Sequence, residues 1–308
     1  MSERARGVAL VVAAVSSLQF GAGFAVTLFD ELGPAGAAFL RLAIAAVVLV
    51  AIWRPRPHGE LGPGGAAFLR QAFAAVVLLA IWRPRFRRNL HLAAAFGITL
   101  GLMNLCIYEA MDRIPLGIAV TIEFWGPLAV AVFGSRRTLD LLWVALAAAG
   151  IVLLADPGGS LDTAGVAFAF AAGGLWVGYI LLSVRVGAVY PGGTGLAIAM
   201  VFGALVTLPF GLGPDLLAPE MLAAGAAVAL ASSVIPYSLE LEALRRLPAR
   251  VFGVLMSLEP AVAALAGLVV LGQALALDEW AAIALVVVAS AGATMTPNRG
   301  MEQAAARS

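Results

Sequence analysis

Runs of apolar residues recur along the whole chain, and their lengths match the thickness of a lipid bilayer. About 20 residues of α-helix, rising ~1.5 Å per residue, cross the ~30 Å hydrocarbon core of a membrane. We therefore expect an all-α integral membrane protein. The pattern predicts helices at residues 8–29, 34–53, 63–82, 91–111, 114–134, 139–155, 164–184, 194–213, 222–241, 251–271 and 279–296.

Composition agrees with this pattern. The chain is 62% hydrophobic and 12% charged, whereas soluble domains are roughly half apolar and a quarter charged. The net charge of +1 and the lack of a basic patch argue against nucleic acid as a partner. The first apolar run follows Arg4 and Arg6 but is too long for a signal peptide, so we interpret it as a retained helix. The lone Cys106 lies in an apolar run, where packing is its expected role.

Every basic residue other than histidine is an arginine, so the positive-inside rule can be applied to arginine alone. If the loops alternate, and residues 54–90 count as one cytoplasmic block, only Arg113 falls on the outer side, and Arg41 and Arg70 lie within spans. This asymmetry predicts that both termini are cytoplasmic. The inner arginines are residues 4, 6, 54, 56, 83, 85, 87, 88, 136, 137, 185, 245, 246, 250, 299 and 307.

The second and third apolar segments are near copies of each other. Residues 31–56 recur as residues 60–85, and 22 of the 26 positions agree. Arginines flank both ends of the second copy, so a segment held inside at both ends would not cross the membrane. We predict ten functional spans, with one copy (34–53 or 63–82) displaced; an assembly artefact is the alternative, and the pattern does not say which copy is native-like.

A second, more diverged repeat relates the two halves of the chain. The segment from Pro115 to Pro127 matches that from Pro248 to Pro260, each beginning and ending in proline. Five spans per half would invert one half relative to the other, as in secondary transporters with a binding site near mid-membrane. The expected architecture is an inverted five-plus-five repeat, with halves at 8–155 and 156–296 and a cytoplasmic tail at 297–308.

Each diverged repeat carries one acid near the middle of a span, Glu123 in the first and Glu259 in the second. Charge inside hydrocarbon costs about 2.5–3.5 kcal/mol and usually faces a cavity or a partner. Glu109, Glu240 and Glu242 lie closer to the predicted span ends. Our hypothesis is that the central pair binds substrate or protons; the alternative is a structural bond to Arg41 or Arg70.

Prolines accompany both acids. Pro127 has no N–H to donate to the carbonyl of Glu123, and Pro260 likewise frees the carbonyl of Met256. We therefore predict helix kinks at Pro127 and Pro260, beside the acids.

Other polar and aromatic residues could complete a cavity around the two acids. Asn104 and Tyr108 are four residues apart and share a helix face, as do Trp176 and Tyr179, three apart. The predicted binding residues besides the acids are Gln19, Asn104, Tyr108, Trp125, Trp176, Tyr179 and Tyr237.

The sequence has no phosphate-binding loop, metal-ligand cluster or nucleophile triad, which argues against an enzyme, a cofactor or a metal site. A transporter predicts a water-reachable central cavity that touches both acids. The alternative from a different functional class is a membrane scaffold, in which the acids would be sealed in packed helix interfaces. The expected partners are a small-molecule substrate and membrane lipid, with the chain a monomer or homodimer.

The stretches at residues 114–140 and 235–272 resemble the drug/metabolite transporter superfamily, in its EamA-type domain. They look most like the bacterial threonine/homoserine exporter branch. The resemblance spans roughly residues 8–296 and implies ten helices in the bacterial plasma membrane. It also implies export of small amino acids or related metabolites, driven by the proton gradient; a broader metabolite or drug exporter is the alternative. The duplicated second helix is a departure from that family.

Overall fold

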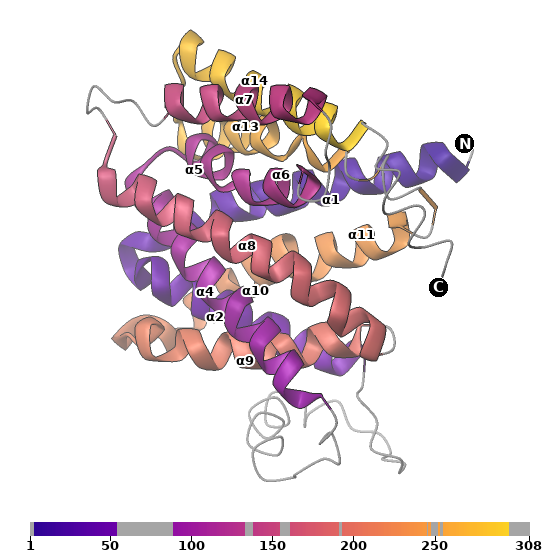
Figure 1. The fold of residues 1–308 in the computed structure, drawn as a ribbon. Helices are drawn as coiled ribbons and strands as arrows, with labels where there is room; N and C mark the ends of the chain where they lie inside the picture. The colour runs from indigo at the N-terminus through magenta and orange to yellow at the C-terminus, as the bar shows by residue number, and fades with distance from the viewer. Residues whose placement is uncertain are drawn as a thin grey trace.

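The computed structural model describes residues 3–53, 89–132, 138–154, 161–190, 193–244, 246–247, 252 and 255–295. Within these ranges the chain forms helices and connecting turns and no strand, which confirms the all-α prediction (Figure 1). The first half contains α1 (Glu3–Val26), α2 (Phe29–Trp53), α4 (Leu90–Arg113), α5 (Leu116–Glu123), α6 (Trp125–Val132) and α7 (Thr138–Leu154). The second half contains α8 (Thr163–Val189), α9 (Thr194–Gly211), η2 (Pro214–Leu217), α10 (Pro219–Ala229), η3 (Leu230–Val234), α11 (Ile235–Leu244), α13 (Glu259–Leu271) and α14 (Leu277–Met295).

Six of the described helices are long and apolar enough to cross a bilayer, judged by length and composition. Large apolar side chains of these helices remain exposed, for example Val184, Leu205 and Phe210. A soluble protein rarely exposes such continuous apolar surface. The outer faces therefore suit contact with lipid. The six are Ala5–Val26, Phe29–Ile52, Leu90–Arg113, Thr163–Val189, Thr194–Gly211 and Pro219–Glu240.

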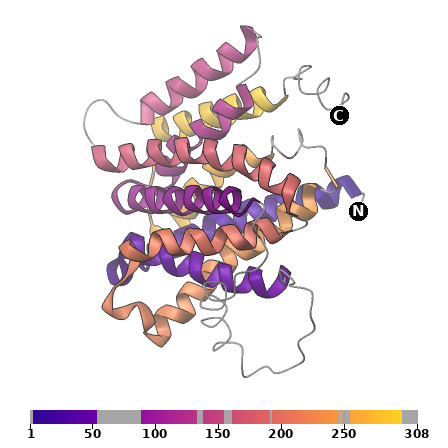
Figure 2. The ribbon, with the colours of Figure 1, turned by 60° about the horizontal axis from the view of Figure 1, so that its bottom comes forward.

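The helices pack in pairs that match when the two halves are exchanged. Helix α4 packs against α8, and its counterpart α11 packs against α1. The counterparts α2 and α9 pack against each other, as do α5 and α13, and α7 and α14. The first turn of α1 and the last turn of α14 lie at the same side of the bundle in both views (Figures 1 and 2). This matched packing is what the predicted five-plus-five repeat requires. The proposed limit between the halves at residue 155 lies outside the described residues.

Glycines allow the closest of these helix contacts. A β-carbon at Gly97 in α4 would overlap the carbonyl oxygen of Ala199 in α9, and one at Gly126 in α6 would overlap that of Gly173 in α8. Small residues at such crossings let two helix backbones approach closely in a membrane.

Two predicted continuous spans are interrupted in the structure, and a third contains a π-helical segment. The span predicted at 114–134 is two helices, α5 and α6, separated at Phe124. In the span predicted at 251–271, α13 begins only at Glu259, after a turn at residues 257–258. The third, predicted at 222–241, consists of α10, the π-helical segment η3 and α11.

The two prolines explain the two interruptions. Pro127 and Pro260 each lie in the first turn of a new helix, α6 and α13 respectively, where a backbone N–H has no intrahelical partner. The breaks therefore fall before the prolines, and they place each acid at a helix end: Glu123 is the last residue of α5, and Glu259 is the first of α13.

The structure assigns the first copy of the duplicated segment to the bundle. That copy forms α2, and its Leu42 is fully buried in a cluster with Ala45, Leu49 and Met200. The second copy has Gln71 at the matching position, where an amide would need a hydrogen-bonding partner. The second copy, residues 63–82, lies outside the described residues.

Candidate functional site

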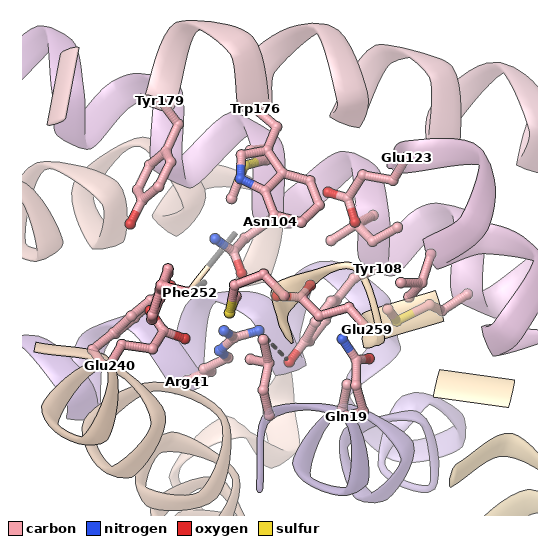
Figure 3. A pocket seen from close by; sticks show the side chains of 18 residues that line it. Gln19, Arg41, Asn104, Tyr108, Glu123, Trp176, Tyr179, Glu240, Phe252 and Glu259 are labelled. Carbon is pink, nitrogen blue, oxygen red and sulfur yellow. Dashed lines mark hydrogen bonds between the residues drawn. The ribbon is translucent and has the colours of Figure 1, made fainter. Parts of the chain in front are cut away.

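A cavity of about 230 Å³ lies inside the bundle, between helices of both halves (Figure 3). Helices α1, α2, α4 and α5 of the first half line it, with α8, α11 and the start of α13 from the second. The lining residues are Leu18, Gln19, Ala22, Arg41, Met103, Asn104, Ile107, Tyr108, Met111, Val120, Glu123, Trp176, Tyr179, Tyr237, Glu240, Phe252, Met256 and Glu259.

Both central acids lie at a helix end beside a break, and both line this cavity. Glu123 is 6% exposed and Glu259 is 2% exposed, so neither carboxyl faces lipid or bulk water. Oε1 of Glu259 has no hydrogen-bond partner among the described residues. A buried polar atom of this kind is costly unless a ligand, a proton or water satisfies it.

One cation shares the cavity with the acids. The Arg41 guanidinium is held by Ser233 Oγ (2.9 Å from Nε), by the Ser232 carbonyl oxygen (2.7 Å from Nη2) and by the Tyr108 hydroxyl (3.2 Å from Nη1). Among the described residues Arg41 forms no ion pair with Glu123 or Glu259, although Arg41 and Glu123 are close enough to interact electrostatically. The alternative of a structural ion pair between Arg41 and a central acid therefore does not describe this arrangement.

Six of the further predicted residues lie where the sequence analysis expects them, on the cavity wall. The amide of Asn104 donates to the carbonyl oxygen of Leu100 at 2.8 Å, which leaves its side-chain oxygen without a hydrogen bond in the described part of the chain. Phe124, next to Glu123, packs edge-on against Trp176. The six residues are Gln19, Asn104, Tyr108, Trp176, Tyr179 and Tyr237.

Trp125 does not line the cavity. Its Nε1 donates to the carbonyl oxygen of Phe170 at 3.0 Å, and its ring packs against Gly173 and Gly174 of α8. Trp125 follows Glu123 by two residues, a spacing that places two side chains on nearly opposite faces of a helix. Trp125 therefore packs on α8 and is not among the residues that line this cavity.

Two charged residues outside the predicted binding set, Arg41 and Glu240, also lie on the cavity wall. The sequence suggests Arg41 only as a partner for an acid, and Glu240 lies close to a predicted span end. Ser233, Tyr237 and Glu240 follow one another at spacings of four and three residues, which puts them on one helix face. That spacing is the signal that could have identified Glu240.

The described residues contain no group of three or more His, Cys, Asp or Glu side chains that could hold a metal ion. The polar part of the cavity wall can instead form hydrogen bonds and charge pairs with a small organic molecule. Pockets for drug-sized ligands are about 300–1,000 Å³, so a cavity of about 230 Å³ suits a smaller molecule.

Comparison with known proteins agrees with this geometry. The profile of the EamA-like transporter family matches residues 163–295, which run from α8 to α14. The threonine/homoserine exporter RhtA of Salmonella typhimurium strain LT2 is 38% identical over 297 residues, which cover 94% of this chain and 92% of that protein. RhtA of Escherichia coli strain K12 is 38% identical over 296 residues, covering 94% of this chain and 91% of its own.

This chain belongs to the EamA-like transporter family. Membership of this family, within the drug/metabolite transporter superfamily, confirms the resemblance of the two repeated stretches. With the apolar helices, it makes the chain a multi-pass membrane protein. A solved crystal structure shares the fold, with a TM-score of 0.57 and 18% identity over 93% of this chain and 98% of its own.

Proposed function

We propose that this EamA-family protein is a secondary active exporter of small amino acids, of the threonine and homoserine kind, in the bacterial plasma membrane. The observation that carries the proposal is the single cavity that holds a mid-span acid from each half. The relatives that are 38% identical are named threonine/homoserine exporters, which supports this choice of substrate.

The mechanism we propose is alternating access, with the two halves moving relative to each other around the cavity. When the cavity is open to the cytoplasm, the ammonium group of an amino acid binds to Glu123 or Glu259. The carboxyl releases its proton inwards at this step. After the substrate leaves on the outer side, a proton from outside returns to the carboxyl, so export is coupled to proton entry.

Two features favour this proposal over the alternatives. A cavity of about 230 Å³ suits an amino acid better than a drug-sized substrate. A scaffold would seal the two acids in packed interfaces, whereas here both line one cavity.

The arginine distribution supports an orientation with both termini in the cytoplasm.

The test is export of radiolabelled threonine and homoserine from loaded cells that produce the wild-type chain or the double variant Glu123→Gln, Glu259→Gln. We expect the wild type to export both amino acids and the double variant to fall to the background rate, because an amide neither carries a proton nor attracts ammonium. Glu220→Gln is the matched control, since this acid is exposed at the start of α10.

Equal rates in the wild type and the double variant would rule out the role of the acids. A wild type that exports neither amino acid would refute the proposed substrate.

A further inference from the structure

Arg41 carries a buried charge for which the proposed proton-coupling step has no use. It is 5% exposed in the middle of α2. A charge at this depth is rare and usually marks a substrate path or a partner. Because its protein contacts are two oxygens of uncharged residues and one backbone carbonyl, its positive charge has no paired anion among the described residues.

The contacts of Arg41 leave part of the guanidinium available. A guanidinium carries five N–H donors. Nε, Nη1 and Nη2 each donate once, to Ser233, Tyr108 and Ser232 respectively. One N–H therefore remains on each of the two terminal nitrogens, the pair that can bind both oxygens of a carboxylate.

Residues from both halves of the protein hold the Arg41 guanidinium in place. Tyr108 comes from α4 in the first half, and Ser232 and Ser233 come from the π-helical segment η3 in the second. Single π-helical turns are rare and frequently occur at functional sites. Here η3 presents two carbonyl oxygens to side chains: Ala231 accepts from Ser17 Oγ at 2.6 Å, and Ser232 accepts from Arg41. A guanidinium fixed in this way is already oriented for its ligand.

The acids occupy other parts of the same wall. Arg41 and Glu123 enter the cavity from opposite sides of the view, and Glu240 and Glu259 also line it (Figure 3). Among the described lining residues, Arg41 is the sole cation against three carboxyls. This distribution suits a small molecule with one anionic end and one cationic end.

We propose that Arg41 binds the carboxylate of the transported amino acid and so sets its orientation, with the ammonium group towards the glutamates. The inference rests on the proposed function and adds to it a requirement for a free carboxylate. Amines, amino alcohols and amino-acid amides would then be poor substrates even when their side chain is that of threonine.

The first arm of the test uses the wild-type protein in proteoliposomes. Uptake of labelled threonine is measured in the presence of unlabelled threonine, threoninamide or threoninol as competitor. Threoninamide and threoninol keep the side chain and the ammonium group of threonine but lack its carboxylate. We expect threonine to compete at least about tenfold better than either analogue, the difference typical of a charge-assisted contact. Equal competition by threoninamide would overturn the proposal without any variant.

The second arm uses Arg41→Gln and Arg41→Lys. We expect Arg41→Gln to raise KM for threonine by about tenfold to a hundredfold and to abolish the preference for threonine over threoninamide. Arg41→Lys keeps the charge but loses the two-pronged geometry, so part of the preference should return. Arg185→Gln, which changes an exposed arginine of α8 away from the cavity lining, is the control and should behave as the wild type.

The outcomes separate the two proposals. If the wild type moves no amino acid, the proposed function fails. If it moves threonine and Arg41→Gln keeps the full preference over threoninamide, Arg41 is only a brace between α2, α4 and η3, and this inference fails while the exporter stands. If Arg41→Gln does not fold, the wild-type competition and Arg41→Lys decide the question.

Discussion

At the scale of residues, the cavity depends on polar side chains that hold one another in place. Tyr108 is fully buried, its hydroxyl accepts from Arg41, and its ring packs against Phe29 at 5.5 Å between centroids. The hydroxyl holds Arg41 by a hydrogen bond, whereas the ring packs in the core and its centroid lies 5.7 Å from the Arg41 guanidinium carbon. A substitution that removes only the hydroxyl can separate the two contacts.

We predict that Tyr108→Phe raises KM for threonine about fivefold, because Arg41 is less well oriented without this bond, and that it lowers the stability of the protein by no more than about 1 kcal/mol, the net contribution of one hydrogen bond. Transport kinetics in proteoliposomes and melting of the purified protein measure the two effects. Tyr190→Phe is the control, because the buried Tyr190 hydroxyl has no hydrogen-bond partner among the described residues, so its loss should leave KM unchanged and stability unchanged or slightly raised. An unchanged KM in Tyr108→Phe would contradict the positioning role.

At the scale of helices, close backbone contacts determine where the polar side chains point. Gly97 and Gly173 each face a neighbouring helix at a distance that excludes a β-carbon. The helix breaks were predictable only in part. The prolines indicate an interruption beside each acid, but the exact residue of each break depends on how the flanking helices pack.

Gly97→Ala should lower the stability of the protein by about 1–3 kcal/mol, the usual cost of overpacking. The added methyl group meets the backbone of α9 at Ala199, which cannot move as a side chain can. Gly187→Ala is the matched control, because a β-carbon there meets nothing within 4 Å. It should be neutral or stabilising by up to about 1 kcal/mol, since alanine is the better helix former. Melting temperatures in detergent compare the two, and equal values would contradict the close packing of α4 on α9.

At the scale of the whole molecule, the orientation of the helices after α2 depends on which side of the membrane the block between α2 and α4 begins and ends. The arginine distribution predicts that both ends of this block are cytoplasmic. His58 and Arg87 lie within the block, outside the described residues.

We predict that cysteines placed at His58 and Arg87, in a Cys106→Ala background, are both protected from an impermeant thiol reagent in intact cells. Both should react in inside-out vesicles, because arginines hold these loops on the cytoplasmic side. A cysteine at Asp215, an exposed residue on the predicted outer side, is the control that should react in intact cells. Reaction from outside at only one of the two test sites would mean that the second copy crosses the membrane.

The pattern of the amino-acid sequence was enough to predict the all-helical membrane class, the family and the two-half repeat, and to single out the two central acids as candidate site residues. These properties follow from local hydrophobicity and from repeated motifs, because a bilayer requires every span to be apolar and helical. The tertiary contacts were needed to show that Arg41 and Glu240 reach the cavity, that Trp125 does not, and that the first copy of the duplicated segment packs as α2. The direction of a side chain around its helix depends on where each helix breaks and on which neighbour it packs against, and those contacts join residues far apart in the chain.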